Sequence, residues 1–363
     1  MSPAGRPGTD VLIAGAGIVG ASIAWECARR GASVALVDRG RAGGEASGAA
    51  AGMLAPASEA HGPGAFLEMG LRSLAAWPAF AAGIEEAGGG DCQLALDGLL
   101  RVALDAADAA AVRARLDWQR AGGIEAAWLD EGALRQAEPA LGPAVHGAGL
   151  YAREGHVHGP RTVAALLAAL HHHGATVIEG AEVTGWEPAG AAVTLTTGQA
   201  PSAPVVVIAA GSWSTDLCTR LGLEAPAVTP VRGQLLALRG VEPPPRRVLF
   251  GGLLGYAVPK RDGTVLVGAT EDEAGFDRSV TEAGRRQLHA VAARLLGGAA
   301  AATEVASWAG LRPRSADGLP ILRELAPASG PGRPQVLLAT GHHRNGVLLA
   351  PLTAETIADL ALR

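Results

Sequence analysis

Short apolar runs and longer helical patterns alternate along this chain of 363 residues. Near the N-terminus, a strand pattern at Asp10–Ala14 is followed by a helical pattern at Ala21–Arg30 and a second strand pattern at Ser33–Val37. Later, Pro204–Gly211 is a continuous apolar run, which predicts a strand buried on both faces, and Ser214 after it is the predicted N-cap of a helix. The N-terminal order of strand, helix and strand is that of a nucleotide-binding βαβ unit.

Other patterns predict a long helix and a hairpin. Ala65–Ala87 has the apolar spacing of a helix that is kinked or restarted at Pro78. Gly255–Lys260 and Thr264–Gly268 predict two antiparallel strands, joined by the turn Arg261–Gly263. The chain therefore combines βαβ organisation with antiparallel strands.

A complete dinucleotide-binding fingerprint lies in the N-terminal unit. Gly15 is placed for the tight turn, Gly17 for close approach of the backbone to a pyrophosphate, and Gly20 for close packing of helix on strand. Asp38 ends the second strand, where a carboxylate can accept a hydrogen bond from a ribose hydroxyl and disfavours a 2′-phosphate. The fingerprint alone leaves both NAD and FAD open.

The loop at 43–54 favours FAD over NAD. It is made almost entirely of small residues, so backbone amides can pack against a ligand that extends past the first phosphate site. FAD has such an extension in its ribityl chain and isoalloxazine ring. The alternative is a glycine-rich connector between two units.

A second unusual turn lies near the C-terminus. A strand pattern at Gln335–Thr340 leads into the turn Gly341–Pro351, and a helical pattern at Thr353–Leu362 follows. The turn carries Arg344, and backbone amides at a helix N-terminus attract anions and electron-rich groups. Alone, the segment could also be a helix entry with a surface arginine.

Two single residues stand out in strand patterns. Tyr256 begins the first strand of the hairpin, and pattern alone describes it as a half-buried strand aromatic. Arg312 precedes Pro313, which favours extended backbone, and its planar guanidinium could bind a carboxylate at two points. The alternative for Arg312 is a surface arginine near a turn.

Composition excludes several classes of protein. With 48% hydrophobic and 18% charged residues, the chain is globular, and a net charge of −5 gives no electrostatic footprint for nucleic acid. No apolar run reaches the roughly 18–20 residues of a membrane span. The three cysteines lack metal-ligand spacing and fit a reducing cytoplasm, and the consecutive histidines 171–173 point in different directions, so no metal site is expected.

The fingerprint, Asp38-Arg39, the run Ser47–Pro56 and the turn Gly341–Gly346 together resemble the FAD-dependent D-amino-acid oxidase and glycine oxidase family. The resemblance extends over nearly the whole chain. It is closest to the glycine oxidases of thiamine biosynthesis. It implies non-covalent FAD, since no cysteine lies near the C-terminal turn, bound by Gly15, Gly17, Ile18, Val19, Gly20, Asp38, Arg39, Ala46, Ser47, Ala51, Gly52, Met53, Val183, His342, His343, Arg344, Asn345, Gly346, Val347 and Leu348.

The resemblance also implies a fold that is α/β plus α+β. A glutathione-reductase-like FAD-binding Rossmann domain is expected at 1–75, 148–222 and 305–363. A smaller antiparallel-sheet substrate domain is expected at 76–147 and 223–304.

For the chemistry, the resemblance implies that Tyr256 faces the substrate, that Arg312 pairs with its carboxylate and that Arg344 is a second cation. The C-terminal amides would face the flavin where reduction places negative charge. Glu271 departs from the family, which can have an apolar residue there, as do His343, often an aromatic, and Leu254, sometimes a histidine.

The implied reaction is oxidation of glycine, and of sarcosine or small D-amino acids, by oxygen to an imine or glyoxylate with hydrogen peroxide. No side-chain base is required. The expected partners are a small amino acid, oxygen, a thiazole synthase that takes the imine, and a second copy of the chain in a homo-oligomer. The alternatives are a D-amino-acid dehydrogenase with another electron acceptor, a flavin protein without turnover, and an NAD-dependent dehydrogenase.

Overall fold

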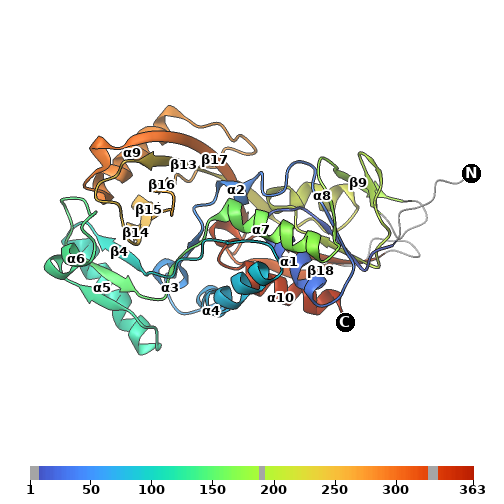
Figure 1. The fold of residues 1–363 in the computed structure, drawn as a ribbon, viewed down its shortest axis with the longest axis horizontal. Coiled ribbons are helices and arrows are strands. Elements are labelled where there is room, and N and C mark those ends of the chain that lie inside the picture. The colour runs from blue at the N-terminus through green and yellow to red at the C-terminus, as the bar shows by residue number, and fades with distance from the viewer. Residues whose placement is uncertain (1–7, 188–192, 326–333) are drawn as a thin grey trace, which may run out of the picture.

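The computed structural model describes residues 8–187, 193–325 and 334–363. In this described part, the molecule forms two lobes (Figure 1). One contains α1 (Ile18–Arg29), α7 (Gly159–His172) and α10 (Ala350–Ala361), and the other contains α5 (Ala106–Ala121), α6 (Glu131–Ala137) and α9 (Glu282–Leu295). Each lobe is organised around one sheet.

The first lobe contains a mainly parallel sheet. Its strands run in the order β18 (Ile321–Leu325), β19 (Gln335–Thr340), β12 (Val205–Ile208), β1 (Val11–Ala14), β2 (Val34–Val37) and β8 (Thr176–Ile178). All neighbours pair in parallel except β18 with β19. This is the sheet that the βαβ pattern predicts, and its central strands are buried on both faces.

Alternate residues of these strands enter different cores. Ile13, Leu36 and Val207 pack with α1, α7, α10 and the long helix α4 (Ala65–Glu86). Leu12 and Ile208 pack on the other face against α8 (Ser214–Arg220) and the small sheet of β9 (Val183–Trp186), β10 (Val193–Leu195) and β11 (Gly198–Gln199). The parallel strands are continuously apolar because both faces are covered.

The second lobe contains a larger, mainly antiparallel sheet. Its strands run in the order β17 (Thr303–Ser315), β13 (Val228–Arg239), β16 (Thr264–Gly268), β15 (Tyr256–Pro259), β14 (Val248–Phe250), β4 (Leu99–Ala103), β6 (Gly147–Tyr151) and β5 (Ala127–Leu129). Only the described pair β14 and β4 is parallel. The predicted hairpin is confirmed as β15 and β16.

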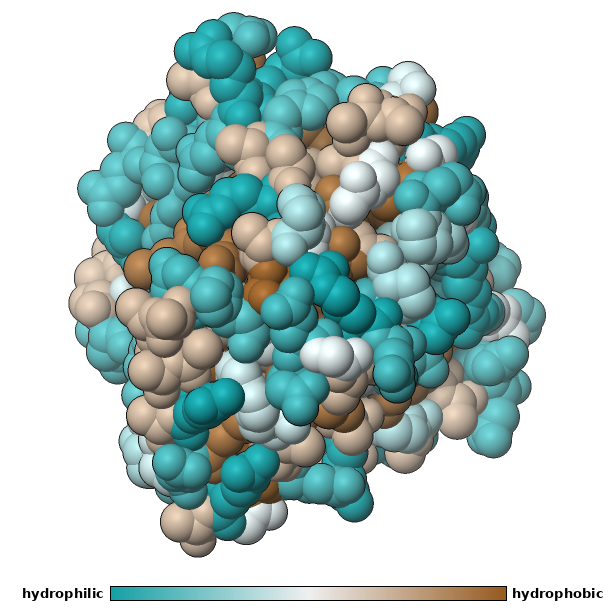
Figure 2. All heavy atoms as spheres, turned by 90° about the vertical axis from the view of Figure 1, so that its left-hand side faces the viewer, coloured by the Kyte–Doolittle hydropathy of each residue, from teal (hydrophilic) through white to brown (hydrophobic). Residues whose placement is uncertain are grey.

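The two faces of this sheet have different neighbours. One face packs against α9 (Glu282–Leu295) and α6 (Glu131–Ala137). The other face, with Phe250 and Tyr256, packs against α5 (Ala106–Ala121) and against Ala51, Ala55 and Leu67 of the first lobe. The core around Tyr256 is therefore shared by both lobes. On the outer end of the second lobe, hydrophilic and hydrophobic side chains are interspersed (Figure 2).

Several short elements connect the lobes: α2 (Ala46–Ala49), α3 (Pro56–Glu59), and the paired β3 (Met53–Leu54) and β7 (Gly155–His156). The predicted domain boundaries after residues 75, 147 and 304 fall inside α4, β6 and β17. Both β6 and β17 belong to the sheet of the second lobe, whereas α4 packs in the core of the first.

Three local predictions differ from the structure. Ser214 is the first residue of α8 and its hydroxyl makes no capping bond, because the preceding 3-10 turn at Gly211–Trp213 already leads into the helix, so the predicted N-cap is wrong. The helix α4 continues through Pro78, so of the two predicted alternatives the restart is wrong. The C-terminal helix begins at Ala350, with Pro351 in its first turn, rather than at Thr353. None of the described helices is both long and apolar enough to cross a membrane.

Candidate active site

The turn between β1 and α1 is shaped by its glycines. Gly15 has φ +112°, and a Cβ atom there would lie 2.4 Å from the carbonyl oxygen of Ala209. A Cβ atom on Gly20 would lie 1.9 Å from the carbonyl oxygen of Gly15. Gly17 has only the Ser47 hydroxyl near the place of a Cβ, at 3.1 Å. Gly15 and Gly20 therefore permit the close turn, and Gly17 leaves backbone open toward a ligand.

The small-residue loop packs beside this turn. The Ser47 hydroxyl, at the start of α2, accepts a hydrogen bond from the backbone N–H of Ile18 at 2.8 Å. The ammonium of Lys260, the residue that follows β15, donates to the carbonyls of Ala51 at 2.7 Å and Val157 at 2.9 Å. The loop is thus fixed to the first turn of α1 and to the second lobe.

Asp38 lies at the end of β2. Its carboxylate accepts hydrogen bonds from the backbone N–H groups of Ala16 at 2.7 Å and Gly40 at 2.8 Å. Arg39 beside it lies over the ring of Trp213, with 3.9 Å from its guanidinium carbon to the ring centroid. An acidic group and a stacked arginine therefore flank the turn at the end predicted to hold adenosine.

A cavity of about 480 Å³ runs from this turn to Tyr256 and Arg312. Most of the predicted site residues line it: Gly15, Gly17, Ile18, Val19, Asp38, Arg39, Ala46, Ser47, Ala51, Gly52, Met53, Val183, Tyr256, Arg312, His342, His343, Arg344, Gly346 and Val347. Gly20, Asn345 and Leu348 do not line it. Gly20 packs against Gly15, and the Leu348 carbonyl accepts from Ser73 and Trp77 of α4.

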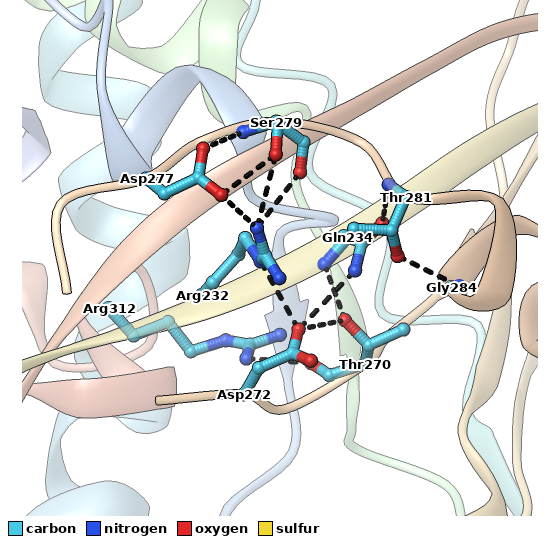
Figure 3. A network of polar contacts seen from close by, with 9 residues as sticks. All are labelled: Arg232, Gln234, Thr270, Asp272, Asp277, Ser279, Thr281, Gly284 and Arg312. Atoms are coloured by element: carbon cyan, nitrogen blue, oxygen red, sulfur yellow. Dashed lines mark hydrogen bonds and ion pairs between the residues drawn. The ribbon is translucent and has the colours of Figure 1, made fainter. Parts of the chain in front are cut away.

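Arg312 lies on β17, in the extended backbone that its position before Pro313 predicts. Its Nη1 donates a hydrogen bond to the carbonyl of Thr270 at 3.0 Å. The guanidinium lies over Gly233 of β13, where a Cβ atom would be 2.2 Å from Nη2. Figure 3 shows the side chain extending alongside β13 toward Thr270. A glycine in the neighbouring strand therefore makes room for the arginine.

Tyr256 is buried next to Arg312. Its ring lies over Gly268, where a Cβ atom would be 2.5 Å from the hydroxyl oxygen. Burial raises the pKa of Tyr256, whereas the positive charges of Arg312 and Arg344 act in the opposite direction. The hydroxyl therefore stays protonated and can donate a hydrogen bond.

The arginines that line the cavity differ in their partners. Arg344 lies 3.6 Å from the carboxylate of Glu59, which raises the pKa of the arginine. Arg39 and Arg220 lie 3.4 Å from Glu45 and 2.6 Å from Glu182. Within the described residues, Arg312 is the one cavity-lining arginine without a carboxylate within 4.0 Å. Its charge is therefore left for a ligand.

Two histidines begin the C-terminal turn. His342 is buried and its Nε2 contacts the hydroxyl of Thr353 at 2.9 Å; burial lowers its pKa to about 4, so the ring is neutral. His343 has φ +47°, which is rare for a residue with a side chain, and its Nε2 is buried without a hydrogen-bond partner in the described structure. Such a combination is typical of functional sites. Glu271 lies 3.6 Å from that nitrogen.

Glu59, Trp213 and Gly233 line the cavity but were not among the predicted residues. Glu59 ends a four-residue helix with no recognisable motif, and Gly233 is one residue of a regular strand. Only the fold shows that Gly233 lies beneath Arg312: β13 pairs with β17 so that Gly233 is opposite Gly310, two residues before Arg312. Trp213 ends the 3-10 turn that follows the apolar strand β12.

The lining fits an extended dinucleotide. The open backbone at Gly17 suits a pyrophosphate, the small loop suits a ligand that continues past it, and the cavity reaches the second lobe. In the described part of the chain, no group of three or more His, Cys, Asp or Glu side chains could hold a metal ion.

Comparison with known proteins agrees with this assignment. Residues 10–360 match the family model described as "FAD dependent oxidoreductase". The chain is 37% identical to the glycine oxidase of Geobacillus kaustophilus (strain HTA426), covering 98% of this chain and 93% of that protein. It is 35% identical to the bifunctional protein ThiO/ThiG of Nostoc sp. (strain PCC 7120), covering 97% of this chain and 52% of that protein.

A solved structure is similar over the whole fold. The crystal structure of glycine oxidase from Geobacillus kaustophilus has a TM-score of 0.91 and 36% identity, covering 99% of this chain and 95% of that chain. The glutathione-reductase-like fold expected from the sequence is thereby confirmed. The chain belongs to the family of FAD-dependent oxidoreductases, and its cofactor is FAD.

Proposed function

We propose that this chain is a glycine oxidase that converts glycine and oxygen to the imine and hydrogen peroxide, with glyoxylate and ammonia formed when the imine is hydrolysed. The observation that carries the proposal is Arg312, a cavity-lining guanidinium whose charge has no carboxylate partner among the described residues. A single free guanidinium suits a substrate with a single carboxylate. The full-length relatives named glycine oxidase support the same substrate.

FAD, held along Gly17 and the loop around Ser47, would supply the two-electron redox chemistry between the amine and oxygen. The side chains then have to bind and orient the substrate. Arg312 holds the carboxylate at two points, which fixes the direction of the Cα–H bond. The protonated hydroxyl of Tyr256 donates a further hydrogen bond to the same carboxylate.

No side chain of this site is assigned as a general base. Glu59 is engaged by Arg344, and Glu271 lies beside Arg314 at 4.0 Å and His343 at 3.6 Å. Glycine therefore enters with its amine neutral, or loses the proton before oxidation. Glu271, where the family can have an apolar residue, disfavours substrates with a second negative charge at that position.

We also propose that the imine passes to a thiazole synthase. The relative called bifunctional protein ThiO/ThiG is about twice as long as this chain, which supports two successive activities on one product. The cytoplasmic location and the homo-oligomer stay predictions; the three cysteines, each buried and free, agree with a reducing compartment. The division into a cofactor domain and a substrate domain stays a prediction as well.

The decisive experiment is peroxide release by the purified flavoprotein with glycine, sarcosine and small D-amino acids. Turnover of glycine with oxygen as the only acceptor supports an oxidase. Turnover that needs an added dye would instead indicate a dehydrogenase, and anaerobic glycine that leaves the flavin absorbance unchanged would indicate a binding protein without turnover. Membership of the FAD family already removes the NAD-dependent alternative.

A further inference from the structure

We propose that Asp272 is a positioning residue for substrate binding, acting through the carbonyl of Thr270 on the guanidinium of Arg312, and that Arg232 and Gln234 hold it in place. The inference rests on the proposed role of Arg312. The residues form a network of polar contacts between β13 and the segment that follows β16 (Figure 3).

Backbone hydrogen bonds attach this segment to β13 at two residues, Arg232 and Gln234. The N–H of Arg232 donates to the carbonyl of Asp272 at 2.8 Å, and the N–H of Asp272 donates back to the carbonyl of Arg232 at 3.0 Å. Two residues further along β13, the N–H of Thr270 donates to the carbonyl of Gln234 at 3.3 Å. The segment therefore continues the pairing of β16 with β13 without being a regular strand.

Arg232 is a buried cation held by two acids of the same segment. It is 7% exposed, and its guanidinium lies 3.3 Å from the carboxylate of Asp272 and 2.6 Å from that of Asp277. Nη1 also contacts the carbonyl and the hydroxyl of Ser279, both at 3.3 Å. A buried charge with several partners fixes geometry, because each broken contact leaves a buried polar group unpaired.

The carboxylate of Asp272 is the centre of this network. Its Oδ2 accepts from Nε of Arg232 at 3.3 Å, from Nε2 of Gln234 at 3.3 Å and from the hydroxyl of Thr270 at 3.2 Å. The same hydroxyl accepts from the N–H of Gln234 at 3.0 Å. The Gln234 amide oxygen accepts in turn from the N–H of Thr281 at 2.7 Å. Thr270 is thus held through both its backbone and its side chain.

The network contacts Arg312 through the carbonyl of Thr270. That oxygen accepts from Nη1 of Arg312 at 3.0 Å, and Gly233 leaves the guanidinium free of any side chain beneath it. One neutral acceptor anchors the arginine without neutralising its charge. The remaining donors stay available for a carboxylate, and the long side chain is ordered before the substrate arrives.

A network that only stabilised the fold would differ from one that positions Arg312. For fold stability, the hydroxyl of Thr270 and the carboxylate of Asp272 need only be satisfied by any partner. If Asp272 positions Arg312, a substitution of Asp272 weakens carboxylate binding by Arg312 and changes no other contact in the site. Binding of a carboxylate separates the two cases.

The test uses the flavoprotein with FAD bound and glycolate, a carboxylate without an amine, titrated by the change in flavin absorbance. Asp272→Ala is expected to raise the Kd of glycolate about tenfold or more, because small displacements of an orienting group are costly. Asp272→Asn keeps an oxygen acceptor and is expected to recover most of the affinity. Glu282→Ala, which removes an exposed carboxylate from the neighbouring helix α9, is the matched control and is expected to leave the Kd unchanged.

A double-mutant cycle with Arg312→Met distinguishes an effect of Asp272 through Arg312 from an independent effect. If Asp272 acts through Arg312, adding Asp272→Ala to Arg312→Met raises the Kd by less than about twofold, since the two effects are not additive. The same tenfold effect in both backgrounds would overturn the inference. If Arg312→Met alone leaves the Kd unchanged, it is the proposed role of Arg312 that fails.

A second variant covers the case in which Asp272→Ala does not fold. Thr270→Val removes the hydroxyl that contacts Asp272 and Gln234 but keeps the carbonyl that Arg312 contacts. It is judged by the same cycle, with the melting temperature and the flavin content measured for every variant. A Kd for Thr270→Val equal to that of the parent protein contradicts the inference.

Discussion

The glycine turn and the Arg312 end of the cavity contain different kinds of group. At the turn, Gly15, Gly17 and the loop around Ser47 present backbone and small side chains, and the Ser47 hydroxyl accepts a neutral hydrogen bond from the N–H of Ile18. At the other end, Arg312 and Arg344 lie among acids and carbonyls that decide which charge remains free. The first region selects its ligand by space, whereas the second selects by charge balance.

This difference also concerns where the residues come from. The turn and its loop are contiguous in sequence, so one segment determines the shape. The charge balance at Arg312 depends on β13, β16, β17, α3 and the C-terminal turn, which only the fold brings together. The two regions should therefore respond differently to substitution.

The largest effect is expected for Gly17→Val. The new side chain occupies the open backbone at the turn and lies against the Ser47 hydroxyl, so the protein should fold but purify without FAD and without activity. The flavin absorbance per protein and the melting temperature are the measurements. Gly83→Val, at a helical position with no atom within 4 Å of the added Cβ, is the control and should keep its flavin. Retention of full flavin by Gly17→Val contradicts selection by space.

A smaller effect, confined to the substrate, is expected for Gly233→Ala. The added Cβ displaces the guanidinium of Arg312, so kcat/KM for glycine should fall by about two orders of magnitude with unchanged flavin content. Steady-state kinetics of peroxide release measure it. Gly185→Ala, on β9 in open space, is the matched control. Equal loss of flavin and of activity in Gly233→Ala would mean that the two regions are not independent.

Glu59→Gln should change specificity rather than activity. It removes the charge that offsets Arg344, so an amino acid with a second carboxylate should gain on the order of tenfold in kcat/KM relative to glycine. Iminodiacetate and glycine compared in the same assay give this ratio. Glu68→Gln, an exposed acid on α4, should leave the ratio alone. An unchanged ratio of kcat/KM for iminodiacetate and glycine would show that the charge of Arg344 does not affect substrate binding.

The smallest effect concerns Lys260, whose ammonium contacts carbonyls of the cofactor loop. Burial lowers its pKa to about 7, from the ordinary 10.5. In the pH window between these values the unfolded chain binds more protons, so the stability of the folded state rises with pH from about 7 to 10.5 and is lost as pH falls. Within this window each pH unit should add up to about 1.4 kcal/mol to the free energy of unfolding.

Lys260→Met removes this titration. Chemical denaturation of both proteins between pH 7 and pH 10 should show a free energy of unfolding that increases more steeply for the parent protein than for the variant. Parallel curves would mean that Lys260 stays charged throughout, and that the loop is held by charge rather than by neutral hydrogen bonds.

The sequence predicts the first region better than the second for a physical reason. The roles of Gly15, Gly17 and Asp38 follow from local backbone geometry, which a short motif specifies. The role of Gly233 depends on its register opposite Gly310 on β17, and the role of Glu59 depends on where α3 lies. Neither can be inferred from the periodicity of the sequence. The wrong N-cap at Ser214 has a similar cause, because a 3-10 turn precedes the helix.

The strand β17 has a consequence for how such enzymes can be rebuilt. It carries Arg312, yet Gly310 on the same strand lies so close to α2 that a Cβ atom would be 2.6 Å from the Cβ of Ala49, and the indole N–H of Trp308 donates to the Ala49 carbonyl at 3.1 Å. The strand that carries the proposed substrate-binding arginine thus also packs against α2. A substrate lobe transplanted from a relative would bring a foreign surface against that loop, so exchange of specificity has to carry 46–49 and 303–315 together.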